Sequence, residues 1–158
     1  MMHELLAGAA KTMAGQRYCW LITTAEDGTH ARPMGRIPAE PGEDALTVRF
    51  LADGRSRKAA EIRRCGKVMA IYENQPSDGY VNVTGTAVLQ NDPSAVRLRW
   101  KRGYEAYFQT EADRAHALFV EVSIERMELW IRGVTPEPFG TTPTVLERDE
   151  KGWRLVGA

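Results

Sequence analysis

Residues 50–58 are Phe-Leu-Ala-Asp-Gly-Arg-Ser-Arg-Lys, a strand end that passes through a turn into a basic helix start. Ser56 is a good N-cap, and residues 57–64 have helical spacing. A helix N-terminus attracts anions, and a phosphate dianion there would meet free backbone N–H groups, the Ser56 hydroxyl and the cations Arg57 and Lys58. The stretch therefore predicts a phosphate anchor; the alternative is an ordinary capped surface helix with solvated charges.

Ahead of this turn the sequence predicts a short amphipathic helix over residues 3–14 and three strands. The strands cover residues 18–24, 29–37 and 45–52, and the third leads directly into the phosphate-anchor turn. Asp27-Gly28 is a strong hairpin signal between the first two strands. Pro33 lies inside the second strand, which indicates an edge or a bulge there.

Beyond the turn the pattern predicts further strands over residues 67–73 and 80–90, and a last long strand or strand pair over 117–124 and 126–131. In the 80–90 strand, Tyr80, Asn82, Thr84 and Thr86 share one face and Val81, Val83, Gly85 and Ala87 the other. Asp92-Pro93 opens a helix whose apolar surface extends to Phe108. A final hairpin is predicted from residues 144–148 and 153–156.

Length and composition limit the classes of protein to consider. The 158 residues fit one domain, with an N-terminal helix in 1–15 and a C-terminal tail or hairpin in 133–158. Twenty-one Lys plus Arg balance twenty-one Asp plus Glu, so the global charge favours neither a nucleic-acid nor a membrane partner. There is no apolar run of the ~20 residues that a membrane span needs, and the N-terminus does not follow the secretory pattern. We therefore expect a soluble, cytoplasmic protein.

Cysteine and histidine patterns predict neither a disulfide framework nor a metal site. Cys19 and Cys65 stand alone, and the three histidines are scattered, which is typical of surface or packing residues. Strands in hairpins without βαβ alternation predict a mainly β fold, an antiparallel barrel or sandwich with helices at its ends. With neither a GxGxxG nor a Walker loop in the sequence, a phosphate-bearing ligand would be held by that barrel.

Several segments together resemble the pyridoxamine 5′-phosphate oxidase superfamily of split-barrel flavoproteins, and more closely its short general stress protein type. The similarity covers roughly residues 16–132. It depends on five features in order: a strand beginning near Arg17, Arg32-Pro33-Met34, the 50–58 turn, Val81 to Ala87, and Glu128-Leu129-Trp130. The resemblance implies a six-stranded antiparallel split β-barrel that binds FMN at the interface of a homodimer.

By position, the resemblance assigns Arg32, Arg57 and Lys58 to the FMN phosphate, with help from Ser56. The backbone around Pro33-Met34 and Leu51-Ala52 would line the isoalloxazine ring. Tyr80 falls where the family often has a glutamine near the flavin, and Trp130 from the other subunit would pack at the ring edge. The alternatives are a core aromatic for Trp130 and a solvated strand charge for Arg32.

The sequence also departs from the oxidase proper. The Arg-x-His pair that would grip a pyridoxal substrate is absent from residues 132–138, and Ile37 fills the place of an expected lysine. Arg97, Arg99, Lys101 and Arg102 offer charge for some other anion. The tail around Trp153 faintly resembles the oxidase C-terminus, which suggests a role in dimer packing. We therefore expect a flavin site without the vitamin substrate site.

The resemblance implies an FMN-dependent oxidoreductase, in which a small-molecule donor reduces the flavin and a second substrate or oxygen reoxidises it. The sequence contains no recognisable Ser-His-Asp set or paired carboxylates, so no residue is assigned a catalytic role. One alternative is a stress protein that binds flavin without turnover. A split barrel that uses a deazaflavin, or less readily haem, is another.

Overall fold

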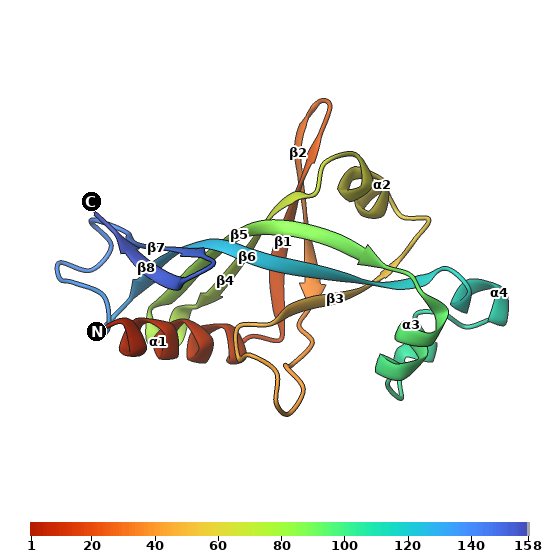
Figure 1. Ribbon diagram of the computed structural model, residues 1–158, viewed down its shortest axis with the longest axis horizontal. Helices are drawn as coiled ribbons and strands as arrows, with labels where there is room; N and C mark the ends of the chain where they lie inside the picture. The colour runs from red at the N-terminus through yellow and green to blue at the C-terminus, as the bar shows by residue number, and fades with distance from the viewer. Residues whose placement is uncertain (158) are drawn as a thin grey trace.

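The computed structural model describes residues 1–157, which fold around one antiparallel sheet (Figure 1). The strands of this part of the chain are β1 (Tyr18–Ala25), β2 (Gly28–Gly35), β3 (Val48–Asp53), β4 (Lys67–Asn74), β5 (Gly79–Gln90), β6 (Ala117–Ile131), β7 (Thr144–Asp149) and β8 (Gly152–Val156). The helices are α1 (Met2–Ala14), α2 (Arg57–Arg64), α3 (Pro93–Arg99) and α4 (Glu111–Arg114), with short 3-10 turns η1 (Gln75–Ser77) and η2 (Tyr104–Ala106). The fold is mainly β, as predicted.

The sheet runs in the order β2-β1-β4-β5-β6-β7-β8, and β3 pairs with β6 away from this path. The first half of β6 therefore joins β3, and its second half joins β7, while β5 lies along most of its length. Strands β1 to β6 form the open, split barrel that the sequence predicted. The sheet exceeds the predicted six strands because the C-terminal hairpin, predicted separately, joins the same sheet as β7 and β8.

A β-bulge between Thr84 and Gly85 bends β5 across the barrel. A Cβ on Gly85 would lie 2.1 Å from the Ser123 carbonyl oxygen, so a side chain at this position would collide with the backbone of β6. The close approach of the two strands at this point therefore depends on a glycine.

The core lies between the concave face of the sheet and α1, which crosses below the sheet in Figure 1. Leu5, Ala9 and Met13 of α1 are buried there, at the helical spacing that the sequence predicted. In β5 the predicted alternation is confirmed: Val81 and Val83 are fully buried, whereas the residues between them are half-buried on the outer face. The outer face is therefore the polar and aromatic side of the sheet.

Three predicted boundaries need correction. The third strand begins at Val48 rather than at residue 45, because Asp44 closes a turn by accepting a hydrogen bond from the Leu46 amide at 2.9 Å. The predicted strand or strand pair near the end of the barrel is one continuous strand, β6. The helix after Asp92 is capped as predicted, with Asp92 accepting from the Ala95 amide at 3.1 Å, but it ends at Arg99.

The segment beyond α3 is not a continuation of that helix. Gly103 has a positive φ of 101° and starts the separate turn η2, after which α4 follows. Trp100, Tyr104 and Phe108 pack around Phe119 of β6 in a small second core, whereas Leu98 on α3 is 85% exposed. The aromatic residues that the sequence placed along one helix thus serve a compact cap at one end of β6.

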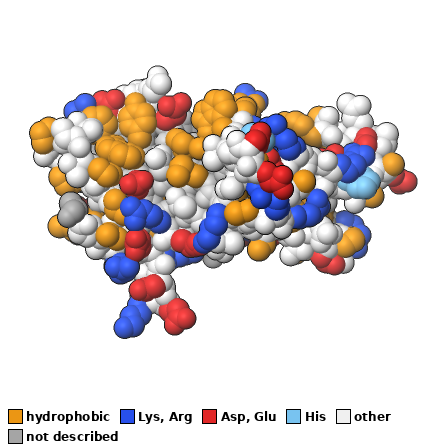
Figure 2. Space-filling model, turned by 90° about the horizontal axis from the view of Figure 1, so that it is seen from above, with side chains coloured by type: hydrophobic (Ala, Val, Ile, Leu, Met, Phe, Trp, Pro, Cys, Tyr) orange, Lys and Arg blue, Asp and Glu red, His pale blue; other side chains and the backbone are white. Residues whose placement is uncertain are grey.

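The surface carries both signs of charge. Figure 2, which looks onto the molecule from above, shows Lys and Arg side chains intermingled with Asp and Glu near the middle of this face, and hydrophobic side chains gathered towards the left. This mixture agrees with equal numbers of acidic and basic residues in the sequence. Within residues 1–157, every helix is too short or too polar to cross a bilayer.

Candidate functional site

The turn between β3 and α2 has the predicted cap. Ser56 Oγ accepts a hydrogen bond from the Ala59 amide at 3.3 Å and donates one to the Asp53 carbonyl at 2.6 Å. Its backbone is extended, as an N-cap requires. The Ser56 hydroxyl therefore closes the turn and starts the helix in this structure, and its predicted contact with a phosphate remains a prediction.

Three cations gather beside this cap. Lys58 and Arg57 lie in the first turn of α2, and Arg32 reaches the same region from β2. Burial lowers the pKa of Lys58, and the positive charge of Arg32 lowers it further. Among residues 1–157, Lys58 has no hydrogen-bond or ion-pair partner. Positive charges that disfavour one another in this way stabilise an anion placed between them.

Arg32 is held in place from three directions. Its Nη1 donates to the Leu21 carbonyl at 3.2 Å and to Thr23 Oγ1 at 2.8 Å, and its Nη2 donates to Glu61 Oε1 at 3.2 Å. The side chain is 16% exposed. The alternative interpretation of Arg32 as a solvated strand charge is therefore wrong, because this guanidinium is mostly buried and hydrogen-bonded.

A cavity of about 700 Å³ opens next to this cluster. One wall consists of Pro33 and Met34 from β2 with Leu51 and Ala52 from β3, and Lys58 borders it. Five of the ten residues predicted for the cofactor site therefore line one cavity. Its volume is within the range of sites that bind small molecules.

The opposite wall was not predicted as part of this site. It is formed by Tyr104 and Tyr107 from the η2 segment, together with Lys101 and Arg102, and Arg36, which follows β2, also lines the cavity. The sequence analysis identified Lys101 and Arg102 as charge for an anion but treated the tyrosines as helix surface. Tyr107 is 77% exposed in the folded chain, a property that the apolar spacing of its segment does not show, so the sequence carried no signal that would have marked it as a cavity residue.

This second wall is attached to the rest of the molecule by ion pairs. Lys101 Nζ lies 3.0 Å from Glu40 Oε1, and Arg99 Nη2 lies 3.7 Å from Glu43 Oε2. Both carboxylates belong to the loop between β2 and β3. One side of the cavity is thus closed by the loop between β2 and β3 and by the segment after α3, which are far apart in the sequence.

Tyr80 and Trp130 lie elsewhere in the chain. They are direct neighbours in the β5–β6 register, and both are half-buried on the outer face of the sheet. Neither residue lines the cavity described above. The interpretation of Trp130 as a core aromatic does not hold, because its cross-strand position places it on the face opposite the core.

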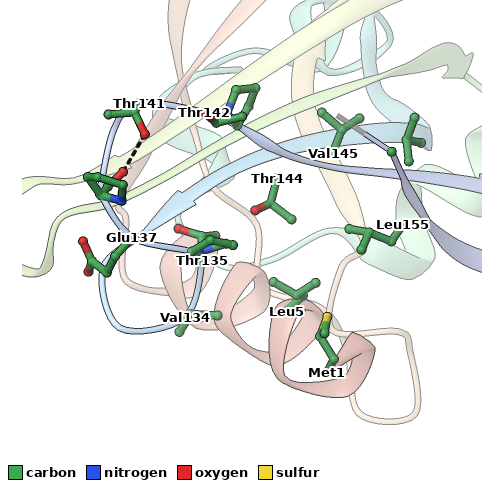
Figure 3. Close-up of a pocket in the computed structure, with 15 residues that line it drawn as sticks. Met1, Leu5, Val134, Thr135, Glu137, Thr141, Thr142, Thr144, Val145 and Leu155 are labelled. Carbon is green, nitrogen blue, oxygen red and sulfur yellow. Dashed lines mark hydrogen bonds between the residues drawn. The ribbon is translucent and has the colours of Figure 1, made fainter.

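A second cavity, of about 570 Å³, lies between α1 and the C-terminal hairpin (Figure 3). Its lining is mainly apolar side chains, prolines and threonines, such as Leu5, Val145 and Leu155, which point inward in Figure 3. Glu137 supplies a negative charge, and none of the described residues that line it is a lysine or an arginine. This cavity therefore lacks the side-chain cations that a phosphate requires, unlike the one beside α2.

A model of the family described as pyridoxamine 5′-phosphate oxidase like matches residues 7–135. The chain belongs to this family. The predicted resemblance is thereby confirmed, and the family's segment contains both walls of the cavity and the whole of α2. The C-terminal hairpin lies outside the matched residues.

Solved structures agree with this family fold. A protein related to general stress protein 26, from Clostridium acetobutylicum, aligns with a TM-score of 0.73 at 14% identity and covers 93% of this chain and 96% of its own. A pyridoxamine 5′-phosphate oxidase-related FMN-binding protein of Nostoc punctiforme has a TM-score of 0.68 at 12% identity, covering 98% and 96%. PhzG from Burkholderia lata, in complex with tetrahydrophenazine-1-carboxylic acid, gives 0.68 at 17% identity, covering 98% and 88%.

These identities are low, so the likeness to solved structures establishes the split-barrel fold alone. No curated protein sequence matches the chain.

Proposed function

We propose that this chain binds FMN in the cavity beside α2 and acts as a flavin-dependent oxidoreductase without a site for pyridoxamine phosphate. The observation that carries the proposal is the placement of Arg32, Arg57 and Lys58 together at the N-terminus of α2, where Lys58 borders a cavity with an apolar wall. Membership of the family and the FMN-binding protein of Nostoc punctiforme support the choice of ligand.

The phosphate end of FMN has a suitable partner in this cluster. The three cations and the buried carboxylate among them, Glu61, leave a net charge of two positive units, which balances the two negative charges of a phosphate dianion. The first backbone N–H groups of α2 point in the same direction as the helix dipole and favour the same charge. Ser56 joins this anchor if its hydroxyl turns from Asp53 to the ligand.

The ring end of FMN needs a flat apolar surface with backbone groups at its edge. Pro33-Met34 and Leu51-Ala52 provide such a wall from β2 and β3, two strands that are not paired with each other in the sheet. When bound, the flavin supplies hydride and electron transfer, and the protein supplies position and environment. The tasks of the chain's own residues are then to anchor the phosphate, to orient the ring against β2 and β3, and to keep water from the wall side of the ring.

A homodimer completes the proposed site. Tyr80 and Trp130 lie on the outer face of the sheet, as do Trp20 and Tyr18, which are 46% and 55% exposed. Exposed aromatic side chains gathered on one sheet face are typical of protein interfaces. A second copy that covers this face would bring its Trp130 to the edge of the flavin ring bound in the first copy.

The test of the proposal is a titration of the purified protein with FMN. We expect a flavin absorbance band to remain with the protein after removal of excess FMN. Arg32→Ala, Arg57→Ala and Lys58→Ala should each weaken FMN binding by about tenfold or more, since each removes a charge-assisted contact worth roughly 1.5–3 kcal/mol. Lys11→Ala, which removes an exposed cation on α1, is the matched control.

A protein that stays colourless would overturn the proposed ligand, and unchanged affinity in all three variants would overturn the proposed position. Steady oxidation of NADH or NADPH with added FMN would support the oxidoreductase. Stoichiometric binding without turnover of any donor would instead identify a flavin-binding protein that is not an enzyme.

A deazaflavin is the second candidate, because one observation favours it. Such a cofactor carries a longer phosphate-bearing tail, which requires basic residues along the exit of the cavity. Arg36, Lys101 and Arg102 line the cavity and supply such basic residues. Parallel titrations with FMN and with a deazaflavin cofactor separate the two, and tighter binding of the deazaflavin would replace FMN in the proposal.

A further inference from the structure

Glu61 is a buried carboxylate at the centre of the cation cluster. It lies on the inner face of α2, and the residue is 8% exposed. Its Oε1 accepts hydrogen bonds from Thr23 Oγ1 at 2.8 Å and from Arg32 Nη2 at 3.2 Å, and its Oε2 contacts His30 Nδ1. One carboxylate thus joins α2 to both strands of the β1–β2 hairpin.

The carboxylate is ionised at neutral pH despite its burial. Burial raises the pKa of Glu61, but hydrogen bonds from Thr23 and His30 outweigh this effect and leave the pKa below its usual value. A buried negative charge so close to an anion site would by itself repel a phosphate. Its presence therefore needs a gain that offsets the repulsion.

The geometry of Arg32 supplies that gain. A guanidinium has five N–H donors, and three of those of Arg32 are used by Leu21, Thr23 and Glu61. The plane of the guanidinium is therefore fixed. The other two N–H groups have no acceptor among residues 1–157 and are available to a ligand. An arginine fixed in this way binds a phosphate without first losing side-chain freedom.

We infer that Glu61 is a positioning residue, which orients the Arg32 guanidinium towards the ligand phosphate at a net gain in affinity. This inference depends on the proposed FMN site and adds to it a residue that does not itself touch the ligand. Arg57, whose Nε lies 4.0 Å from Glu61 Oε1, is at the edge of the same arrangement.

The test compares FMN with riboflavin, which has the same ring but no phosphate. Glu61→Met removes the acceptor for Arg32, and Glu61→Gln keeps one acceptor oxygen. We expect Glu61→Met to weaken FMN binding by about tenfold, the equivalent of one lost charge-assisted hydrogen bond. Riboflavin binding should change less than twofold, and Glu61→Gln should restore most of the FMN affinity.

The same substitution is then made in an Arg32→Ala background. Because Glu61 acts through Arg32, Glu61→Met should cost little further FMN affinity there. Thermal unfolding of each variant shows whether it is folded, and Glu61→Ala, which also removes the acceptor for Arg32, replaces Glu61→Met if that variant is unfolded.

Three results would overturn the inference. Tighter FMN binding by both variants would show that Glu61 acts only by repulsion. Equal losses for FMN and riboflavin would show a general structural role, and equal losses in both Arg32 backgrounds would show that Glu61 does not act through Arg32. If the unaltered protein binds neither ligand, the proposed function itself fails, and this result is distinct from the other three.

Discussion

Glu43 joins three parts of the chain through one carboxylate. Its Oε2 accepts a hydrogen bond from Arg49 Nη2 at 2.8 Å, and its Oε1 accepts one from the Glu40 amide at 2.8 Å. Arg49 is only 6% exposed, and Arg99 of α3 lies next to the same carboxylate. The hydrogen bond from Arg49, with that from the Glu40 amide, lowers the pKa of Glu43 from 4.5 to about 2.

This shift predicts an acid-dependent loss of stability. Because the pKa of Glu43 is lower in the folded state, its contribution is present above pH 4.5 and is lost as the pH falls towards 2. After allowance for its partial exposure, we expect Glu43 to contribute about 1 kcal/mol to the free energy of unfolding at neutral pH. This corresponds to roughly 2–4 °C in Tm. Melting curves at pH 7 and pH 3 should therefore differ less for Glu43→Gln than for the unaltered protein. An equal difference in both proteins would contradict the assignment.

At the scale of single residues, sequence patterns identified residues whose roles depend on contiguous neighbours. They missed a residue whose partners are distant in the sequence. Ser56 and Lys58 were found because a cap and a basic first turn are contiguous features. Glu61 was missed, since its partners Thr23, His30 and Arg32 are near in sequence to one another but not to it. A glutamate four residues after Arg57 resembles an ordinary helix-surface pair in a sequence.

Among the elements, the hairpin of β7 and β8 has one buried anchor. Leu146 is fully buried in the main core, whereas Leu155, its neighbour across the hairpin, is 49% exposed. The hairpin pairs through β7 with the second half of β6, the strand that carries Trp130.

The two leucines form a matched pair for a stability measurement. Leu146→Ala should lower the free energy of unfolding by about 2–5 kcal/mol, because it leaves a cavity in the core. Leu155→Ala should change it by less than about 0.5 kcal/mol. Urea unfolding of both variants measures the difference, and similar midpoints would mean that the hairpin does not contribute to the core.

Helices and strands were predicted correctly where the periodic spacing of apolar residues reflects burial of one face against a single core. The strands and α1 were found because each buries one face against the same core. The region after Asp92 was extended too far, since its aromatic residues pack on Phe119 from three short elements rather than from one helix. The pattern of apolar spacing alone does not distinguish these two arrangements.

For the whole molecule, the outer face of the sheet is the feature that a single chain leaves unexplained. Trp20 of β1 lies in register with Ile71 of β4 and Asn82 of β5, so these side chains share this face with Tyr80 and Trp130. Trp20 is 46% exposed, which is unusual for so large an apolar side chain.

This face predicts the oligomeric state. We expect the protein to elute from size-exclusion chromatography at twice the monomer mass. Trp20→Glu should elute as a monomer, because a buried unpaired carboxylate opposes association. Leu98→Glu, at an exposed position on α3, is the control and should leave the dimer unchanged. A Trp20→Glu protein that still elutes as a dimer would place the interface elsewhere.

The overall architecture was predicted from the order of motifs rather than from any one of them. Antiparallel hairpins limited the choice to a barrel or a sandwich, and the resemblance then selected the split barrel, which the family match confirms. The second wall of the cavity was beyond this approach, because the loop before β3 and the segment after α3 meet only in the folded chain.

The pairing of β3 with β6 has a consequence for how this protein is made. Residues 48–53 find their hydrogen-bonded neighbours only at residues 117–122. A ribosome therefore releases β3, with the apolar Phe50 and Ala52, long before its partner strand has been synthesised. Nascent chains that end before residue 117 expose an unpaired strand edge, the kind of surface that chaperones bind and that aggregates at high concentration. Closure of the barrel is thus a late event in the life of each new molecule.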